Sequence, residues 1–554
     1  MRTVSILLPL LHLSASLASP TEQIVLGLGD LSRDQQPSSG DAYHVVNEWL
    51  DDAKKAILEG KKNLEKWYHG GKEFIKQNGL LYELVSHPSF DQHQLRVTEP
   101  NLCDPSVKQY SGYLDIADDK YLFFWWILLS AQSLQKELTP AHRFFESRNS
   151  PSTDPLVLWI NGGPGCSSST GLLFELGPCS IANEGNNTTF NKHSWTSNAN
   201  MIFLDQPVNT GFSYGTTVST SPVAGKDVYA FLELFLSRFP EYSKQPFHIS
   251  GESYAGTYLP NIARAIWTGN KQLERPPRSR RPALKKINLE SILIGNGFTD
   301  PYTQFGSVAD YACEGPYPVY SDPEGPECAS LRAKIPTCQR MIKSCYAYNS
   351  RLTCVPALVY CDARLMGPLL QLGLNPYDVR KPCDREKNSL CYEQMNWIDT
   401  WMNDPQVKVA LGVEPTRKFS SCSTAVGLAF GLQGDGAHNS AELLGELVDD
   451  GVRLLIYAGN ADMMCNYMGN ERWLEVLDSS FQDEYVTAQT IPWVTAGSAK
   501  LAGTVRSAGG KGFTAGNVTF VTVFEAGHMV PFDQPEAALD LFSRWISNTP
   551  LSLQ

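Results

Sequence analysis

The sequence has no excess of basic residues and no long internal hydrophobic run. Its 554 residues include 46 Lys and Arg against 58 Asp and Glu, a formal net charge of −12, which argues against nucleic acid or an anionic membrane surface as a partner. Beyond the N-terminus, no segment reaches the ~20 unbroken apolar residues of a membrane-spanning helix. The clustered cysteines Cys338, Cys345, Cys354 and Cys361 lack the close C-x2–4-C spacing of structural zinc sites, so zinc is disfavoured.

The chain begins with the pattern of a secretory signal. Arg2 precedes an apolar run over residues 4–13, and small residues follow, which predicts a signal peptide over residues 1–18. Residues 19–96 are polar and contain a mixed-charge stretch at 45–77 that we predict to be helical. With 42% hydrophobic residues overall, the rest of the chain is long enough to bury the core of a large enzyme.

A serine lies between small residues directly after an apolar, strand-like run. The stretch G-E-S-Y-A-G (251–256) follows P-F-H-I-S (246–250). In a nucleophile elbow, a sharp strand-to-helix turn exposes the serine, and the residues two positions away must be small. Here these residues are Gly251 and Ala255, with alanine in place of the usual second glycine. The pattern predicts Ser253 as a nucleophile, although a surface loop would also match so short a motif.

Two further strand-like runs end in loops that carry an acid and a histidine. L-L-I-Y-A-G-N-A-D (454–462) ends at Asp462, and V-T-V-F-E-A-G-H-M-V-P (521–531) presents His528. The order Ser, Asp, His is the one that α/β hydrolases use. In such a triad the imidazole takes the serine proton and the carboxylate orients the imidazole. Alone, either residue is more simply a turn cap or an ordinary loop histidine, but the shared order and strand-end position favour a triad.

A glycine-rich turn supplies candidates for oxyanion stabilisation. The stretch L-V-L-W-I-N-G-G-P-G-C-S-S (156–168) runs from an apolar strand into glycines, whose backbone N–H groups can approach a developing oxyanion without a Cβ in the way. We predict the N–H of Gly163 as one donor and the N–H of Tyr254, the residue after the nucleophile, as the other. A phosphate-binding loop is the alternative, but the Lys-Ser/Thr pair of a P-loop is absent.

Long motifs extend this pattern from about residue 105 to the C-terminus. They are W-I-N-G-G-P-G-C-S-S (159–168), F-E-L-G-P (174–178), I-F-L-D-Q-P-V-N-T-G-F-S-Y (202–214), G-E-S-Y-A-G (251–256), I-G-N-G-F-T-D-P (294–301), Y-A-G-N-A-D (457–462) and G-H-M-V-P-F-D-Q-P (527–535). Together they resemble the serine carboxypeptidase family, and its fungal vacuolar members above all.

The resemblance implies an α/β-hydrolase fold with a mostly parallel central sheet, helices on both faces and an inserted disulfide-rich cap. The catalytic domain would span residues 97–554, with the cap at about 301–422. Ser253, Asp462 and His528 would form the triad, and Gly163 and Tyr254 the oxyanion hole. The implied activity is release of C-terminal amino acids from peptides and proteins through an acyl-enzyme.

The resemblance also implies a group that binds the substrate's free C-terminal carboxylate: Asn161, Gly162, Glu175 and Glu252. A carboxylate beside two glutamates cannot bind if all three are ionised, because like charges at close range raise one another's pKa. A proton must be shared, so we expect peptide hydrolysis to be best at acidic pH and to fail as the pH rises. Without the family, Glu252 is more simply a solvated elbow residue and Glu175 a helix-surface charge.

The cysteines match the family's disulfide pattern. The implied pairs are Cys166 with Cys422, Cys313 with Cys328, Cys338 with Cys361, Cys345 with Cys354, and Cys383 with Cys391. Cys465 matches a free thiol near the active site, so mercurials should inhibit. Cys103 and Cys179 are left over, and a bond between them is a hypothesis. The implied pocket for the leaving residue comprises Thr170, Phe174, Cys465 and Met529, which points to apolar C-terminal residues.

Processing and location follow from the same comparison. Sequons for N-glycosylation stand at Asn186, Asn187 and Asn517, of which the first two overlap. By similarity, residues 19–96 are a pro-segment that keeps the enzyme inactive until an activating protease removes it. The signal predicts the secretory pathway, the resemblance implies delivery to the vacuole lumen with a sorting receptor as partner, and secretion is the alternative. No metal or organic cofactor is implied.

One segment departs from the family. Members run from a Phe-Trp strand straight into F-F-E-S-R-N, whereas here residues 126–143 separate F-F-W (123–125) from that motif (144–149). Eighteen residues preserve the reading frame, so we interpret them as an intron retained in the gene model. If they are translated, the insert must loop out at a hairpin, and its apolar start, W-I-L-L (126–129), would be exposed.

Two other functions are alternatives to peptidase activity. An acyltransferase on the same fold would lose the carboxylate-binding pair Glu175 and Glu252, and both are present. A non-catalytic binding or protective protein should have lost a triad member or an oxyanion glycine, and none is lost. The sequence therefore favours a serine carboxypeptidase.

Overall fold

The computed structural model describes residues 65–69, 71–104, 107–116, 119–129, 148–150, 152–274, 284–384, 390–510 and 514–551. The predicted signal peptide, the first part of the predicted pro-segment and most of the insert at 126–143 lie outside these residues.

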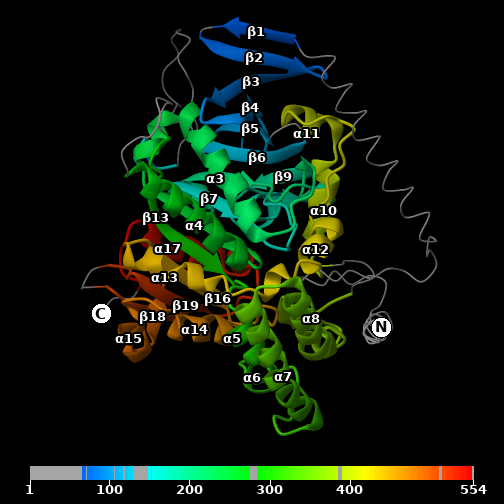
Figure 1. The fold of residues 1–554 in the computed structure, drawn as a ribbon, viewed down its shortest axis with the longest axis vertical. Coiled ribbons are helices and arrows are strands. Elements are labelled where there is room, and N and C mark those ends of the chain that lie inside the picture. Colours follow the sequence, from blue (N-terminus) through cyan, green and yellow to red (C-terminus); the bar gives the residue numbers. More distant parts are fainter. Residues whose placement is uncertain are drawn as a thin grey trace, which may run out of the picture.

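One large twisted sheet forms the centre of the molecule (Figure 1). Its middle strands are mutually parallel and are, in spatial order, β10 (Asn200–Leu204), β7 (Leu156–Ile160), β12 (Phe247–Glu252), β13 (Leu289–Gly295), β16 (Arg453–Gly459) and β19 (Val518–Val523). Every residue of β7, β10, β12, β16 and β19 is buried. Burial along the whole strand is what covering a parallel sheet on both faces produces.

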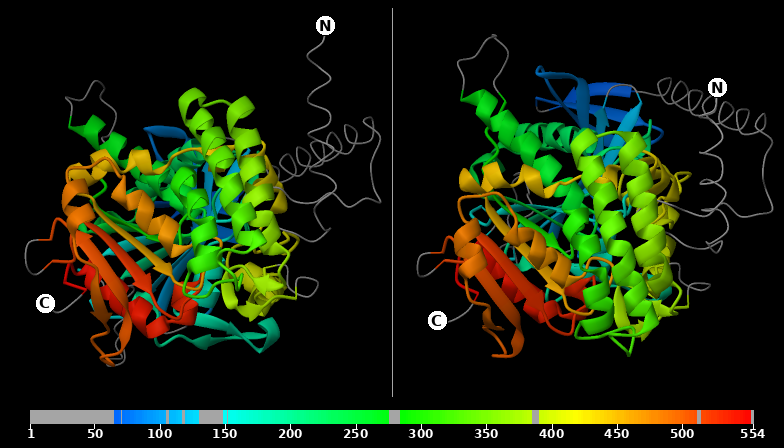
Figure 2. Two further views of the ribbon diagram at one scale, coloured as in Figure 1. Left: turned by 90° about the horizontal axis from the view of Figure 1, so that it is seen from below. Right: turned by 60° about the horizontal axis from the view of Figure 1, so that its bottom comes forward.

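Helices cover both faces of this sheet, as Figure 2 shows. On one face, α4 (Ala255–Leu273) packs on β12 and β13, with α3 (Ser221–Arg238) alongside it. On the other, α17 (Pro535–Ile546) donates the indole N–H of Trp545 to Ser291 Oγ of β13 at 2.9 Å. The remaining C-terminal helices are α14 (Tyr467–Glu475), α15 (Gln482–Thr487) and α16 (Val530–Asp533). The predicted α/β-hydrolase architecture is confirmed.

Antiparallel strands extend the sheet at both ends. On one side lie β1 (Glu65–His69), β2 (Lys72–Gln77), β3 (Leu80–His87), β4 (Phe90–Thr98), β5 (Val107–Ile116) and β6 (Lys120–Leu129), and β11 (Tyr214–Gly215) pairs with β6. On the other side lie β18 (Leu501–Ala508) and β17 (Ile491–Val494). The helical prediction for residues 45–77 is therefore wrong from residue 65 on. These residues form the strands β1 and β2, and within β2 only Ile75 is buried.

The strand β4 ties residues of the predicted pro-segment to the rest of the domain. It pairs with β5 over His93 to Thr98. Between them Arg96, whose side chain is only 4% exposed, forms a salt bridge with Asp115 at 2.8 Å. Tyr82 of β3 donates its hydroxyl to the Gly412 carbonyl at 2.5 Å. The described part of residues 19–96 is thus integral to the sheet.

The first residue of the insert, Trp126, is not exposed. Trp126 continues β6, pairs with Tyr110 and Ile202 on the two neighbouring strands, and is fully buried. Its ring packs edge-on against Phe235 and Phe239. The expectation of an exposed Trp126 is wrong because an apolar side chain can prolong a central strand against α3.

Between β13 and β16 the chain forms a mainly helical region with a small hairpin. Its elements are α5 (Pro301–Gly306), α6 (Val308–Glu314), α7 (Pro326–Tyr348), α8 (Arg351–Cys361), α9 (Gly367–Leu370), β14 (Leu374–Asn375), β15 (Asp378–Pro382), α10 (Glu393–Met402), α11 (Pro405–Ala410), α12 (Thr424–Gly431) and α13 (Gly445–Asp449). The pair α7 and α8 extends away from the sheet at the bottom of Figure 1. Among the described helices, none is both long and apolar enough to cross a membrane.

Candidate active site

Ser253 occupies the turn between β12 and α4, at the carboxyl edge of the parallel strands. Its φ of 63° lies in the left-handed region, a conformation that costs a non-glycine residue on the order of 1–3 kcal/mol. The turn is tight: a Cβ on Gly251 would lie 2.2 Å from the Ile160 carbonyl oxygen, and one on Gly256 2.5 Å from Thr299 Oγ1. Small residues are therefore needed on both sides of the serine, as a nucleophile elbow requires.

His528 and Asp462 meet in the loops that follow β19 and β16. The His528 Nδ1 atom lies 2.7 Å from Asp462 Oδ2, and both side chains are buried. Asp462 Oδ2 also accepts the backbone N–H of Cys465 at 3.2 Å. Because the Asp462 carboxylate accepts each of these hydrogen bonds, Nδ1 of His528 carries the hydrogen and Nε2 of His528 has the free lone pair. Among the described residues His528 Nε2 has no hydrogen-bond partner, and His528 and Ser253 line one cavity.

Asn296, which the sequence interpretation did not single out, fixes the position of Asp462. Its Nδ2 donates to Asp462 Oδ2 at 2.8 Å, and its Oδ1 accepts the N–H of Gly459 at 3.0 Å. Asn296 adopts φ 40°, the left-handed conformation that asparagine tolerates best after glycine. It lies in the motif I-G-N-G, so a signal was present, but spacing alone assigns it no role.

The glycine turn after β7 packs directly on the elbow. A Cβ on Gly162 would lie 2.3 Å from the backbone nitrogen of Tyr254, so any other residue would occupy the space in front of that amide. Gly163 has φ +113°, which also favours glycine. Among the described residues, neither the Gly163 nor the Tyr254 N–H donates a hydrogen bond. Both predicted oxyanion donors are thus available beside Ser253.

Asn161 gathers the two predicted carboxylate-binding glutamates. Its Nδ2 donates to Glu252 Oε1 at 2.9 Å and to Glu175 Oε1 at 3.4 Å. Its Oδ1 accepts the indole N–H of Trp159 at 2.8 Å and the N–H of Gly171 at 2.9 Å. Because both of these groups are donors, the Asn161 amide cannot flip, and its NH2 group stays directed at the two glutamates.

Both glutamates are fully enclosed, and their protonation follows from that burial. Burial, followed by the neighbouring Glu175 charge, raises the pKa of Glu252 well above its usual range. Burial raises the pKa of Glu175 to about 7. In this pair desolvation disfavours the ionised form of each acid, and the two charges disfavour each other. The interpretation of Glu252 as a solvated elbow residue and of Glu175 as a surface charge is wrong, since they are 3% and 4% exposed.

The cavity at Ser253 extends away from the glutamates between the sheet and the helical region. Thr170 and Met529 line it, as predicted. Phe174 does not line it but packs its ring against Phe532 at 4.2 Å. Cys465 does not line it either and is buried, with burial raising the pKa of its thiol well above the usual range. Further lining residues that the sequence did not reveal are Tyr377, Leu390, Met395, Cys422, Ser423, Thr424 and Gly427.

One disulfide joins this helical region to a loop of the sheet, and four others lie within the region. The structure joins Cys166 to Cys422, Cys313 to Cys328, Cys338 to Cys361, Cys345 to Cys354, Cys383 to Cys391, and Cys103 to Cys179. The first of these bonds connects the glycine turn to the segment before α12, and both of its cysteines line the cavity. Of the predicted sequons, Asn186 and Asn187 are exposed on the turn around the hairpin of β8 (Cys179–Ala182) and β9 (Asn187–Phe190), and Asn517 is half-buried.

The comparisons of this chain with known proteins agree with one another. A family model described as serine carboxypeptidase matches residues 142–548. Carboxypeptidase Y of Schizosaccharomyces pombe is 42% identical over 481 residues, which cover 86% of this chain and 44% of that protein. Carboxypeptidase Y homolog A of Talaromyces stipitatus is 45% identical over 449 residues, 80% of this chain and 73% of that protein.

Among solved structures, the chain is similar to Kex1(delta)p, a prohormone-processing carboxypeptidase from Saccharomyces cerevisiae. The TM-score is 0.65 at 25% sequence identity, and the match covers 84% of this chain and 95% of the other.

Proposed function

Because the chain belongs to the serine carboxypeptidase family, we propose that it releases C-terminal amino acids from peptides and proteins through an acyl-enzyme on Ser253. One observation carries this proposal. The cavity that Ser253 and His528 line is also lined by Asn161 and Glu252, so a nucleophile and a buried carboxylate-binding group share one space. An enzyme that cleaves peptide bonds within a chain would not need a group that binds a free C-terminal carboxylate.

In the proposed reaction His528 Nε2 removes the proton from Ser253 as its oxygen attacks the last peptide carbonyl. Asp462 holds the imidazole and stabilises its positive charge. The N–H groups of Gly163 and Tyr254 stabilise the oxyanion, each contributing about 3 kcal/mol to the transition state. His528 then protonates the departing amine, and a water molecule activated by the same imidazole hydrolyses the acyl-enzyme.

The carboxylate group sets the pH range that we propose. Glu252 is protonated over the whole acidic range because its pKa is raised far, and Glu175 keeps its proton up to about pH 7. Glu252, which lines the cavity, can then donate a hydrogen bond to the substrate carboxylate, and protonated Glu175, which does not line it, adds no negative charge nearby. Above that pH, ionised Glu175 repels the substrate, so peptide hydrolysis weakens as the pH rises.

The test is release of the C-terminal residue from an N-blocked apolar dipeptide at pH ~5.5, with the corresponding C-terminal amide as a second substrate. Ser253→Ala should abolish release. Ser250→Ala is the matched control, because Ser250 is a buried serine on the same strand that lies outside the cavity and should leave activity unchanged. A folded wild-type protein that cleaves neither substrate would contradict the proposal, and cleavage of the amide as fast as the free acid would contradict the role of the glutamates.

We also propose that the protein is made as a zymogen in the secretory pathway and reaches a vacuole. The predicted signal at residues 1–18, the disulfides and the fungal relatives named carboxypeptidase Y support this proposal. Release of residues 19–96 by an activating protease, and delivery by a sorting receptor, would complete it. The appearance of a shortened, active chain in a vacuolar fraction tests both steps.

A further inference from the structure

A second cavity lies between helix α14 and the end of the sheet formed by β18 and β19. Its volume is about 290 Å³, close to the lower limit of about 300 Å³ for pockets that hold small molecules. It shares no lining residue with the cavity at Ser253, and the proposed reaction uses none of its residues. The second cavity therefore needs an explanation of its own.

The floor of the second cavity is one face of the antiparallel strands β18 and β19. Thr504 of β18 lies opposite Thr522 of β19. Alternate residues of a strand point to the same face, so Phe520 and Thr522 share that face. Both line the cavity, as do Thr504 and Phe524, the residue after β19. The floor therefore combines two phenylalanine rings with two threonine hydroxyl groups.

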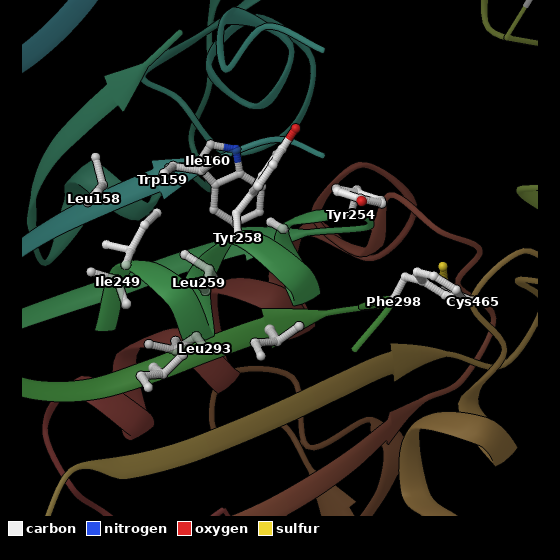
Figure 3. Packing of buried hydrophobic residues seen from close by; sticks show 14 of the residues in the cluster. Leu158, Trp159, Ile160, Ile249, Tyr254, Tyr258, Leu259, Leu293, Phe298 and Cys465 are labelled. Atoms are coloured by element: carbon white, nitrogen blue, oxygen red, sulfur yellow. The ribbon is translucent and has the colours of Figure 1, made fainter. Parts of the chain in front are cut away.

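Helix α14 forms the opposite wall through Tyr467 and Glu471, which are one turn apart. Pro316 and Thr490 also line the cavity and are exposed, so a solute can enter from the solvent. Figure 3 shows Cys465 beyond the carboxyl ends of the central strands, two residues before α14 begins. The helix that covers the second cavity thus begins beside the candidate active site.

Two polar side chains that line the second cavity are buried and have no partner in the described part of the chain. Thr522 is 7% exposed and Asn460 is 8% exposed. Asn460 Oδ1 accepts the N–H of Glu525 at 3.1 Å, which fixes the side-chain amide and leaves its NH2 group as a donor. Neither that NH2 group nor the Thr522 hydroxyl bonds to a described residue, and the same holds for the hydroxyl groups of Tyr467 and Thr504. Buried polar groups without partners are costly, so a bound molecule that supplies the missing hydrogen bonds would be stabilised here.

The charges around the second cavity favour a neutral ligand over an anion. Arg506, which lines it, forms salt bridges with Glu471 at 3.3 Å and Glu475 at 2.8 Å. Its guanidinium also donates to the carbonyl oxygens of Tyr485 at 3.0 Å and Val486 at 2.6 Å. These four hydrogen bonds use four of the five guanidinium N–H groups. No paired donors remain for a carboxylate or a phosphate, whereas the second oxygen of Glu471 remains an acceptor.

We propose that the second cavity binds a hexopyranose ring, either as a free sugar or at the end of a glycan. Each hydroxyl group of such a ring both donates and accepts, which matches a lining of hydroxyl groups, one amide NH2 group and one carboxylate oxygen. The C–H face of the ring would pack on Phe520 and Phe524, because small-molecule sites combine an apolar surface with a few placed polar groups. Binding forms hydrogen bonds and contacts only. This inference is independent of the proposed carboxypeptidase function.

The test measures binding of the methyl glycosides of glucose, mannose and galactose to the full protein by saturation-transfer NMR, with N-acetyl-leucinamide as a neutral molecule that is not a sugar. A ligand of about 12 non-hydrogen atoms should bind with a Kd of about 1 mM. Thr522→Val keeps the shape and removes the hydroxyl group, and Tyr467→Phe keeps the ring; each should weaken binding about threefold to tenfold. Thr210→Val is the matched control, because Thr210 is buried, has no described partner for its hydroxyl group and lines neither cavity.

The outcomes decide both the site and the kind of ligand. If no glycoside binds at about 50 mM, the second cavity holds water only and the proposal is refuted. Equal binding of N-acetyl-leucinamide, or an equal loss of affinity in Thr210→Val, also refutes it. An oligosaccharide that ends in the preferred hexose and binds about tenfold tighter than its methyl glycoside would identify a glycan as the ligand, and equal affinity would identify the free sugar. The comparison of ligands needs no variant, so it decides the matter even if Thr522→Val does not fold.

Discussion

Glu175→Gln should extend peptide hydrolysis to higher pH. Glutamine keeps the shape of the side chain and an Oε1 acceptor for Asn161, which donates to Glu175 at 3.4 Å. Its amide would replace the Oε2 atom, which has no partner among the described residues, and would stay neutral at every pH. What the substitution removes is a titrating group whose pKa is raised to about 7.

The magnitude follows from that pKa. In wild type, loss of one proton at pH 7 should lower kcat/KM for a peptide acid by about tenfold at pH 8 and about a hundredfold at pH 9. In Glu175→Gln this decline should be absent until another group titrates. Glu252 does not replace it in this range, because burial and its neighbour raise the pKa of Glu252 well above the usual range.

The assay is the pH profile of kcat/KM for an N-blocked dipeptide acid, measured beside an N-blocked amino-acid methyl ester. The ester lacks the carboxylate, so wild type should hydrolyse it without the decline near pH 7. An identical decline for both substrates in wild type, or an unchanged profile in Glu175→Gln, would refute the reasoning.

Other predictions concern the positioning groups and the stability of the fold. Asn296→Ala removes a donor to buried Asp462 and leaves an alanine at φ 40°. It should lower kcat by about 10- to 100-fold, with KM for the dipeptide nearly unchanged; a kcat within twofold of wild type would contradict this role. Asp435→Asn weakens the 2.8 Å bond from the Tyr254 hydroxyl and should lower kcat/KM about tenfold, whereas Asp449→Asn, a change at an exposed carboxylate, should not. Several buried carboxyl groups have raised pKa values in the folded state. The native protein therefore binds more protons than the unfolded chain above about pH 4.5, and its melting temperature should fall between pH 5 and pH 8. A rise in melting temperature over that range would show that other groups dominate the pH dependence of stability.

Much of the fold and of the candidate site could be predicted because the relevant patterns are local. The strands that precede Ser253, Asp462 and His528 are mostly apolar and buried at every residue, and each ends at a loop on the same edge of a parallel sheet. Such an edge is where side chains from distant parts of the sequence meet. Local pattern also explains the main error: the charged segment at 65–77 has too few apolar residues for its period to distinguish a helix from a solvent-facing strand.

The contribution of the helical region could not be predicted from residue types. Tyr377 accepts the N–H of His528 at 2.7 Å through its carbonyl oxygen, a role that any residue could fill.

The sheet order also limits how the described part of the predicted pro-segment could act. Four strands, β5, β6, β10 and β7, lie between β4 and β12, the strand that leads to Ser253. Because neighbouring strands are about 4.8 Å apart, β4 and β12 are separated by about 24 Å. Of the residues described before 161, none lines the cavity at Ser253. Release of β4 would instead expose the edge of β5 and leave Asp115 without Arg96, its partner at 2.8 Å. If residues 65–96 restrain the enzyme, they therefore do so through the stability and shape of the sheet rather than by filling the cavity.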